Sequence, residues 1–176
     1  MKDFIKNILL INTFTVAFGI AALADGKGKE ENNNLLFKIE RSRDANEVFY
    51  EVNTLADGTL DTENPIRIYW VKHTENGKTE PLTRIQEKFG YGLKLLQVTH
   101  ETARFQFVSF EQPMTLNKTA NGKYKVFSTI DGQIAEVEQI YIQFLNNSFW
   151  YPKIGKVEMY ATNPNSGKTL VQVINP

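Results

Sequence analysis

The sequence predicts a mainly β protein: a single antiparallel β-sandwich of about nine strands with one short helix, or alternatively a β-barrel. Three observations predict it. Apolar residues recur at every second position in most segments, turn-forming residues separate these segments, and only one segment has apolar residues at helical spacing. Sandwiches and barrels share these signals, so both arrangements stay open.

The first 24 residues have the order of a secretion signal. Lys2 and Lys6 precede an apolar run, Ile8–Leu23, and Ala22–Ala24 places small side chains at the two positions that a signal peptidase reads. The run is interrupted by polar residues and is shorter than the roughly 20 apolar residues that span a bilayer. We therefore expect cleavage after this tripeptide and export to the periplasm or the medium.

A polar segment and one domain are expected after the signal. Residues 25–34 (DGKGKEENNN) have no hydrophobic periodicity, which is typical of a disordered tether. Residues 35–176 have the length at which one hydrophobic core is usually sufficient, so they are predicted to form a single β-rich domain. No later segment is long and apolar enough to cross a membrane.

Charge and cysteine content exclude several classes of protein. The 20 basic and 20 acidic side chains cancel, so we expect no nucleic-acid partner and no stable membrane insertion after signal cleavage. The chain has no cysteine, which excludes disulfides, zinc–thiolate sites and an N-terminal lipid on cysteine.

Nine segments have the alternation of half-buried strands. They are Phe37–Ile39, Val48–Val52, Ile66–Trp70, Leu93–Thr99, Ala103–Phe110, Tyr124–Ile130, Ile134–Leu145, Lys156–Ala161 and Leu170–Ile174. Four turns contain Asn, Asp or Gly, which tolerate positive φ and favour antiparallel hairpins. They are Glu75–Lys78, Asn121-Gly122, Asp131-Gly132 and Asn165–Gly167.

One short helix is predicted over Pro81–Phe89. Leu82, Ile85 and Phe89 lie three and four positions apart, as on one face of a helix. Thr79 is the expected N-cap, and Gly90 stands where a left-handed C-terminal residue would fall.

Known catalytic and metal-binding patterns are not found. The serines lack the G-x-S-x-G context, and Gly90-Tyr91-Gly92 is not followed by the glycine and lysine of a phosphate loop. Asp57–Glu63 has oxygen-bearing side chains at every second position, but its glycine and glutamate do not fit the EF-hand spacing, so we interpret it as a solvated loop. His73 and His100 would bind a metal only if they met in space. We predict no cofactor and no metal.

The densest polar cluster is Glu40–Asn46. Arg41 and Arg43 are two positions apart, so on an extended segment they would point to the same side and could hold a carboxylate, phosphate or sulfate. Alternatively, they pair with Glu40, Asp44 or an acid on a neighbouring strand, and residues 44–46 form the hairpin turn. We favour the second interpretation.

A second candidate surface lies on Ile66–Lys72. Ile66, Ile68 and Trp70 form an apolar face, and Trp70 is expected in the core. Arg67 and Tyr69 occupy the other face, where they could line a pocket or cover the outer side of the sheet.

Three motifs carry a family resemblance: Arg41-Ser42 with Asn46, Pro65-Ile66 with Tyr69-Trp70, and Tyr91-Gly92 after the helix. The chain after the tether resembles a domain-of-unknown-function family of exported bacterial proteins. The resemblance implies that these positions are the first to test, and it implies no catalytic role or cofactor.

Together these features predict a non-enzymatic envelope protein that binds a ligand or a protein partner. The candidate binding residues are Arg41, Arg43, Asn46, Arg67, Tyr69 and Tyr91. One alternative is a lipocalin-like carrier of a small apolar ligand. Another is a hydrolase using carboxylates such as Glu40, Asp44, Asp57 or Asp61 as general acid and base.

Overall fold

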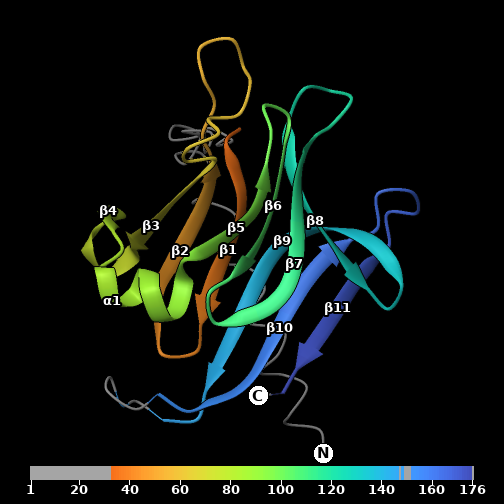
Figure 1. The fold of residues 1–176 in the computed structure, drawn as a ribbon. Coiled ribbons are helices and arrows are strands. Elements are labelled where there is room, and N and C mark those ends of the chain that lie inside the picture. The colour runs from red at the N-terminus through yellow and green to blue at the C-terminus, as the bar shows by residue number, and fades with distance from the viewer. Residues whose placement is uncertain (1–32, 147, 149–151, 176) are drawn as a thin grey trace, which may run out of the picture. The chain divides into compact units, whose positions relative to one another are not determined.

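The computed structural model describes residues 33–146, 148 and 152–175 (Figure 1). The predicted signal peptide and residues 25–32 of the predicted tether lie outside these residues. The last two tether positions are described, and the Asn34 carbonyl accepts a hydrogen bond from the Val52 amide at 2.9 Å. Among the described residues, no helix has the length and apolar character needed to cross a bilayer.

The mainly β class with one short helix is confirmed, with eleven strands in the described part of the chain. The first leaf of the sheet contains β1 (Leu35–Arg41), β2 (Asp44–Val52), β3 (Ile66–Lys72) and β4 (Lys78–Pro81), with a 3₁₀ turn η1 (His73–Glu75) before β4. The helical segment follows, with α1 (Arg84–Gln86) and a π-helical turn η2 (Glu87–Tyr91). The second leaf contains β5 (Leu93–Val98), β6 (Thr102–Phe107), β7 (Phe110–Lys118) and β8 (Tyr124–Ile130). The chain ends with β9 (Gln133–Phe144), β10 (Ile154–Thr162) and β11 (Thr169–Ile174).

The strands form one continuous mixed sheet that curls into a half-barrel. Its order is β4-β3-β2-β1-β9-β8-β7-β6-β5, and β10 and β11 join through β9. Every pair within this sheet is antiparallel except β1 with β9. The sequence predicts only antiparallel pairing because hairpin turns set the direction of sequential strands, whereas β1 and β9 are joined by no hairpin.

β9 is the point where the sheet divides into its two leaves. Its first half pairs with β8 through residues 133–136, and its second half pairs with β1 through residues 139–142. β10 runs along its other edge over residues 136–144. The two leaves therefore diverge from a shared strand and can face each other.

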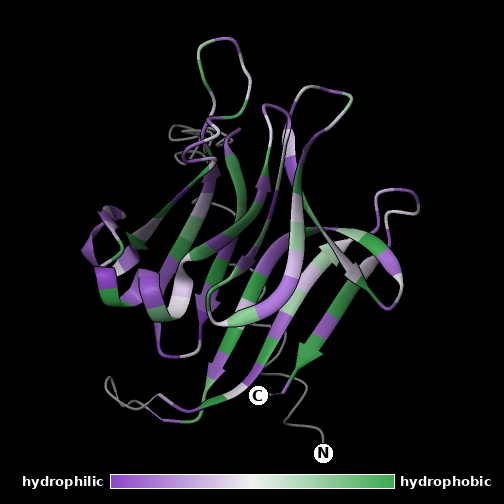
Figure 2. Ribbon diagram, in the orientation of Figure 1, coloured by the Kyte–Doolittle hydropathy of each residue, from purple (hydrophilic) through white to green (hydrophobic). Residues whose placement is uncertain are grey.

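The core lies between these leaves. Phe37 of β1 stacks on Tyr50 of β2 with ring centroids 4.3 Å apart, and both rings meet the edge of Phe107 of β6, at 6.1 and 5.7 Å. Alternate residues of the predicted strands, such as Val48, Tyr50 and Val52, are buried as expected. Figure 2 shows the resulting alternation of hydrophobic and hydrophilic bands along the strands.

All four predicted turns join antiparallel strands. Asn76 and Asp131 have left-handed φ values of 56° and 48°, each followed by a glycine with positive φ, and Gly122 and Gly167 have φ of 82° and 68°. Two strands were not predicted, β4 and β7. Both contain a proline and several polar residues, which weaken the strand pattern.

The helix lies near its predicted position but has different boundaries. Thr83, not Thr79, is the N-cap, since its side chain accepts from the Gln86 amide. Pro81 belongs to β4. Gly90 lies within the π turn without a left-handed φ, and the segment ends at Gly92, whose φ is −68°.

Candidate functional site: an arginine and aromatic cluster beside an anchored helix

Arg41 ends β1 at the centre of a cluster of aromatic and polar side chains. Its Nη2 donates to both carboxylate oxygens of Asp44, at 2.8 and 2.7 Å, and its Nη1 donates to the Tyr91 hydroxyl at 3.2 Å. The guanidinium carbon lies 4.2 Å from the centroid of the Trp70 ring, which Tyr91 meets edge-on at 5.3 Å. Nε is buried and has no hydrogen-bond partner among the described residues. These contacts link β1 to β2, β3 and η2. Because the side chain is only 13% exposed, its guanidinium nitrogens are not open to bind an anion from solvent.

The helical segment, residues 83–91, is held firmly at its N-terminal end, and we call it the anchored helix. Thr83 and Gln86 form a capping box, in which the Thr83 hydroxyl accepts from the Gln86 amide at 3.3 Å and the Thr83 amide donates to Gln86 Oε1 at 3.0 Å. The indole nitrogen of Trp70 donates to the same Oε1 at 3.3 Å. The cap is thereby joined to the first leaf.

The C-terminal end of the anchored helix is held from both leaves. The hydroxyl of the buried Tyr50 donates to the Tyr91 carbonyl at 2.7 Å, and Ser109 Oγ donates to the Gly90 carbonyl at 2.8 Å. Gly92 follows, and a Cβ there would lie 2.0 Å from the Glu87 carbonyl oxygen. Only glycine fits this close approach, because a backbone oxygen cannot move aside as a flexible side chain can.

No residue of the anchored helix is fully buried. Ile85 is 70% exposed and Phe89 is 68% exposed, although their spacing is typical of a buried helix face. Leu82, just before the helix, and Tyr91, at its end, are partly buried and pack against the core. The segment is attached through its backbone, its cap and the Tyr91 side chain, and Ile85 and Phe89 remain exposed to solvent.

Arg43 points away from Arg41. It donates through Nε and Nη2 to the Asn146 carbonyl, at 3.3 and 3.2 Å, and also to the Ser148 carbonyl, and its guanidinium carbon lies 4.3 Å from the Phe144 ring centroid. The turn of the hairpin falls at residues 42–43, not at residues 44–46. The two arginines therefore do not form a shared anion site. The pairing of Arg41 with Asp44 agrees with the interpretation that we favour, whereas the described hydrogen bonds of Arg43 go to backbone carbonyls and not to an acid.

The remaining candidates lie on the first leaf, apart from the Arg41 cluster. Arg67 lies over the Tyr69 ring at 4.6 Å, and the Tyr69 hydroxyl donates to Glu51 Oε1 at 2.5 Å. Burial and then the Glu51 carboxylate raise the pKa of Tyr69. The Asn46 amide oxygen accepts from the Thr74 hydroxyl at 3.4 Å. Among the six predicted residues, the described interactions join two separate pairs, Arg41 with Tyr91 and Arg67 with Tyr69.

The carboxylates of the hydrolase hypothesis are each engaged locally. Glu40 pairs with Lys38 at 2.6 Å, and Asp44 pairs with Arg41. Asp57 and Asp61 accept hydrogen bonds from the backbone two positions further along, which stabilises their loop. The described contacts place no two of these acids together.

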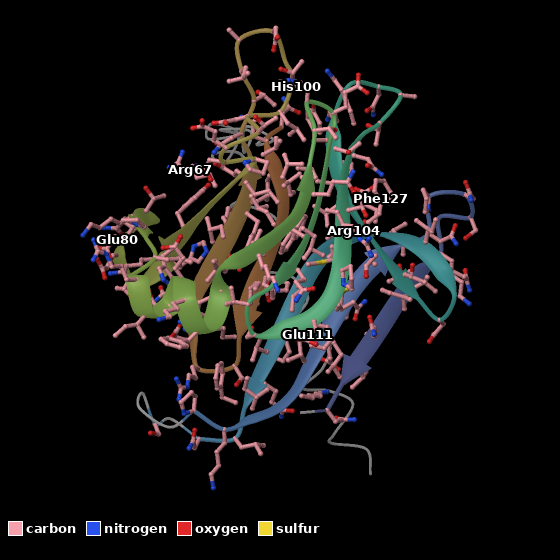
Figure 3. The ribbon with its side chains drawn as sticks, in the orientation of Figure 1. Arg67, Glu80, His100, Arg104, Glu111 and Phe127 are labelled. Carbon is pink, nitrogen blue, oxygen red and sulfur yellow. The ribbon has the colours of Figure 1, made fainter. Side chains whose placement is uncertain are left out.

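The two histidines occupy separate elements. His73 begins η1, and its Nε2 lies 2.5 Å from Glu47 Oε2. His100 lies in the turn between β5 and β6, where its carbonyl accepts from the Leu60 amide at 2.7 Å. Figure 3 shows His100 at the top of the view and Glu80, on β4, at the left. Lys72 and then Lys78 donate to the Glu80 carboxylate, and they lower its pKa to about 2. Among the described residues, no group of three or more acids and histidines is arranged to hold a metal.

A shallow hollow of about 310 Å³ lies elsewhere, between the start of the described chain and the β7–β8 turn. Lys118 and Tyr124, which line it, both donate to the Gly58 carbonyl, at 3.1 and 3.3 Å. These bonds fix the loop that contains Gly58 to β7 and β8. None of the predicted site residues lines the hollow.

The fold and these contacts define a mainly β half-barrel protein in which an arginine and aromatic cluster fixes a short helix to the sheet. The chain belongs to the family described as "Domain of unknown function (DUF4833)", whose model matches residues 37–172. This confirms the predicted resemblance to a family of unknown function. Comparison with curated proteins and with solved structures finds no match.

Sequence reasoning did not identify the exposed pair Ile85 and Phe89. It used both residues as evidence for a helix, and that evidence does not say which way the helix faces. The only available signal was the shortness of the segment, because a helix of two turns has few positions with which to bury a face.

Proposed function

We propose that the protein is an exported, non-enzymatic binding protein of the cell envelope, and that its ligand is another protein that docks on the anchored helix. The observation that carries the proposal is the exposure of Ile85 and Phe89 on a segment that is tied to the core at both ends. Export rests on the order of charged, apolar and small residues at the N-terminus.

A rigid helix with outward apolar side chains suits protein recognition. Large exposed apolar groups cost free energy in water, and burial against a partner recovers it. Because the capping box and the Trp70 and Tyr50 hydrogen bonds already order the segment, binding requires little further loss of backbone entropy. π-helical turns are also frequent at functional sites.

The charges around the pair indicate the chemistry of the partner. Arg84 and Lys88 flank Ile85 and Phe89, and the Lys88 ammonium lies 5.2 Å from the Phe89 ring centroid. Glu87 is the one acid on the segment. We therefore expect a partner surface with an apolar pocket and an acidic rim.

Two observations favour this function over the alternatives. The described space between the leaves is filled by stacked and edge-on aromatic rings, which disfavours a carrier with an internal ligand cavity. The described contacts of Glu40, Asp44, Asp57 and Asp61 are separate local ones, which disfavours a pair that shares one substrate atom.

The test is photocrosslinking in the cell envelope, with the photoreactive residue benzoylphenylalanine at position 89. The matched control carries the same residue at Ile134, which is 64% exposed on β9. We expect one discrete protein adduct from position 89 and not from position 134. The adduct is identified by mass, and its affinity for purified protein should fall at least tenfold in Phe89→Asp and remain within twofold in Ile134→Asp.

Two results would contradict the proposal. Equal labelling from both positions would mean that contact is non-specific. Adducts with phospholipid, together with binding to vesicles of anionic phospholipid that Phe89→Asp abolishes, would make the anchored helix a membrane contact.

A further inference from the structure

The described sheet has three strands with one unpaired edge: β4, β5 and β11. An unpaired edge presents backbone N–H and C=O groups that can bind another strand, and proteins commonly block such edges with charges, prolines or bulges. The three edges of this sheet differ in this protection.

Two of the edges are blocked. β4 is only four residues long and contains Lys78, Glu80 and Pro81. β5 contains the exposed Lys94, and its pairing with β6 shifts register between Leu95 and Gln97, as at a bulge. Neither strand offers a straight, uncharged edge to another chain.

The third edge has no charge, proline or bulge to block it. β11 has the sequence Thr-Leu-Val-Gln-Val-Ile, without a charge or a proline, and it pairs with β10 over six consecutive positions without a register shift. Val171 and Val173 point to the outer face and are 43% and 52% exposed. The strand is fixed from its inner face, where Gln172 Oε1 accepts from Gln112 at 2.9 Å and Leu170 is buried.

We propose that β11 is a homodimer interface, in which β11 strands from two copies of this chain pair antiparallel across a twofold axis at Gln172. The five residues Leu170–Ile174 form a near-palindrome about this glutamine. In an antiparallel pair centred there, Val171 faces Val173 of the second copy, Leu170 faces Ile174, and Gln172 faces itself. Apolar residues then face apolar residues throughout, and no like charges oppose each other.

The sequence symmetry selects a second copy over an unrelated strand. A twofold axis requires the same patch on both partners to be complementary to itself. Antiparallel backbone edges meet this condition in any sequence, but β11 also meets it in its side chains. β-Branched valines opposite each other are favourable cross-strand pairs. The proposal uses the edge opposite β10 and involves no residue of the anchored helix, so it stands independently of the proposed function.

The first test measures the mass of the purified protein by light scattering during gel filtration over a range of concentrations. We expect twice the mass of one chain. In Val171→Lys/Val173→Lys, lysines oppose lysines across the axis, and the dissociation constant should rise at least 100-fold. The matched control, Leu95→Lys/Leu96→Lys, adds the same charge on β5, where both side chains are 41% exposed, and should remain dimeric.

The second test determines the register in this cysteine-free chain. Under mild oxidation, a mixture of Val171→Cys and Val173→Cys proteins should form the mixed disulfide in excess over either protein alone, because these two positions face each other. A monomeric wild-type protein would overturn the proposal. So would a dimer that the β11 lysines leave intact, a dimer that the β5 lysines also dissociate, or equal crosslinking in the mixed and single samples.

Discussion

Replacing Tyr50 with phenylalanine removes one hydrogen bond from the C-terminal end of the anchored helix while leaving the core ring in place. The Tyr50 side chain is fully buried, its ring stacks on Phe37, and its hydroxyl donates to the Tyr91 carbonyl at 2.7 Å. Phenylalanine keeps the stacking and removes only the donor. The substitution therefore isolates the tie between β2 and η2.

The expected loss of stability follows from this one bond. A typical intramolecular hydrogen bond contributes about 1 kcal/mol net, and a buried acceptor left without its donor costs roughly 1 to 3 kcal/mol. The Tyr91 carbonyl lies at the end of a helical turn where water can approach as the turn loosens, so the lower part of this range applies. We expect Tyr50→Phe to reduce the free energy of unfolding by about 1.5 kcal/mol.

Urea unfolding measures the global effect, and amide hydrogen exchange measures where it occurs. Exchange should accelerate at residues 84–92 more than in β1 and β9. Tyr160→Phe is the control, because its hydroxyl bonds to Glu158 at 3.1 Å on the outer face of β10, and it should cost less than about 0.5 kcal/mol. If Tyr50→Phe costs no more than Tyr160→Phe and leaves exchange at the helix unchanged, the hydrogen bond does not anchor the segment.

Three further predictions concern the same fold and its export. Gly92→Ala should cost at least about 2 kcal/mol in urea unfolding, because its Cβ would overlap a backbone oxygen, whereas Gly90→Ala, which meets nothing within 4 Å, should be nearly neutral. Burial raises the pKa of Tyr50 well above its ordinary value, so the unfolded chain releases this proton first. Stability should therefore fall as pH rises above about 10, and less steeply in Tyr50→Phe. Mass spectrometry of the exported protein should find Asp25 as its first residue, and an intact Met1 on exported protein would refute cleavage.

The strands could be predicted because burial on one face of a sheet imposes a period of two. Val48, Tyr50 and Val52 alternate with half-buried neighbours, and the structure places all three in the core. β7 was not predicted because Pro113 and its polar neighbours weaken that period. The parallel pairing of β1 with β9 could not be predicted from local patterns, because it depends on the register of segments about 100 residues apart.

The candidate site was predicted only in part, for local reasons. Arg41 and Arg43 would share a side only on an extended chain, but the hairpin turn lies at residues 42–43, so the two side chains reach different regions. The contact of Arg41 with Tyr91 joins residues 50 positions apart in sequence, and no local pattern predicts it. For Ile85 and Phe89, the helical period was correct, but the exposed direction depends on ties from Trp70 and Tyr50 that no periodicity reveals.

The division of the sheet at β9 has a consequence for the order in which the molecule is assembled. β1 emerges from the ribosome well before its parallel partner in β9, residues 139–142, which is made about 100 residues later. Non-local pairings of this kind form slowly, because a long loop must close before they are stabilised. The two leaves cannot join through this pair until residues 139–142 have been made. If the chain is exported as proposed above, this delay would help to keep it unfolded while it passes through a narrow channel.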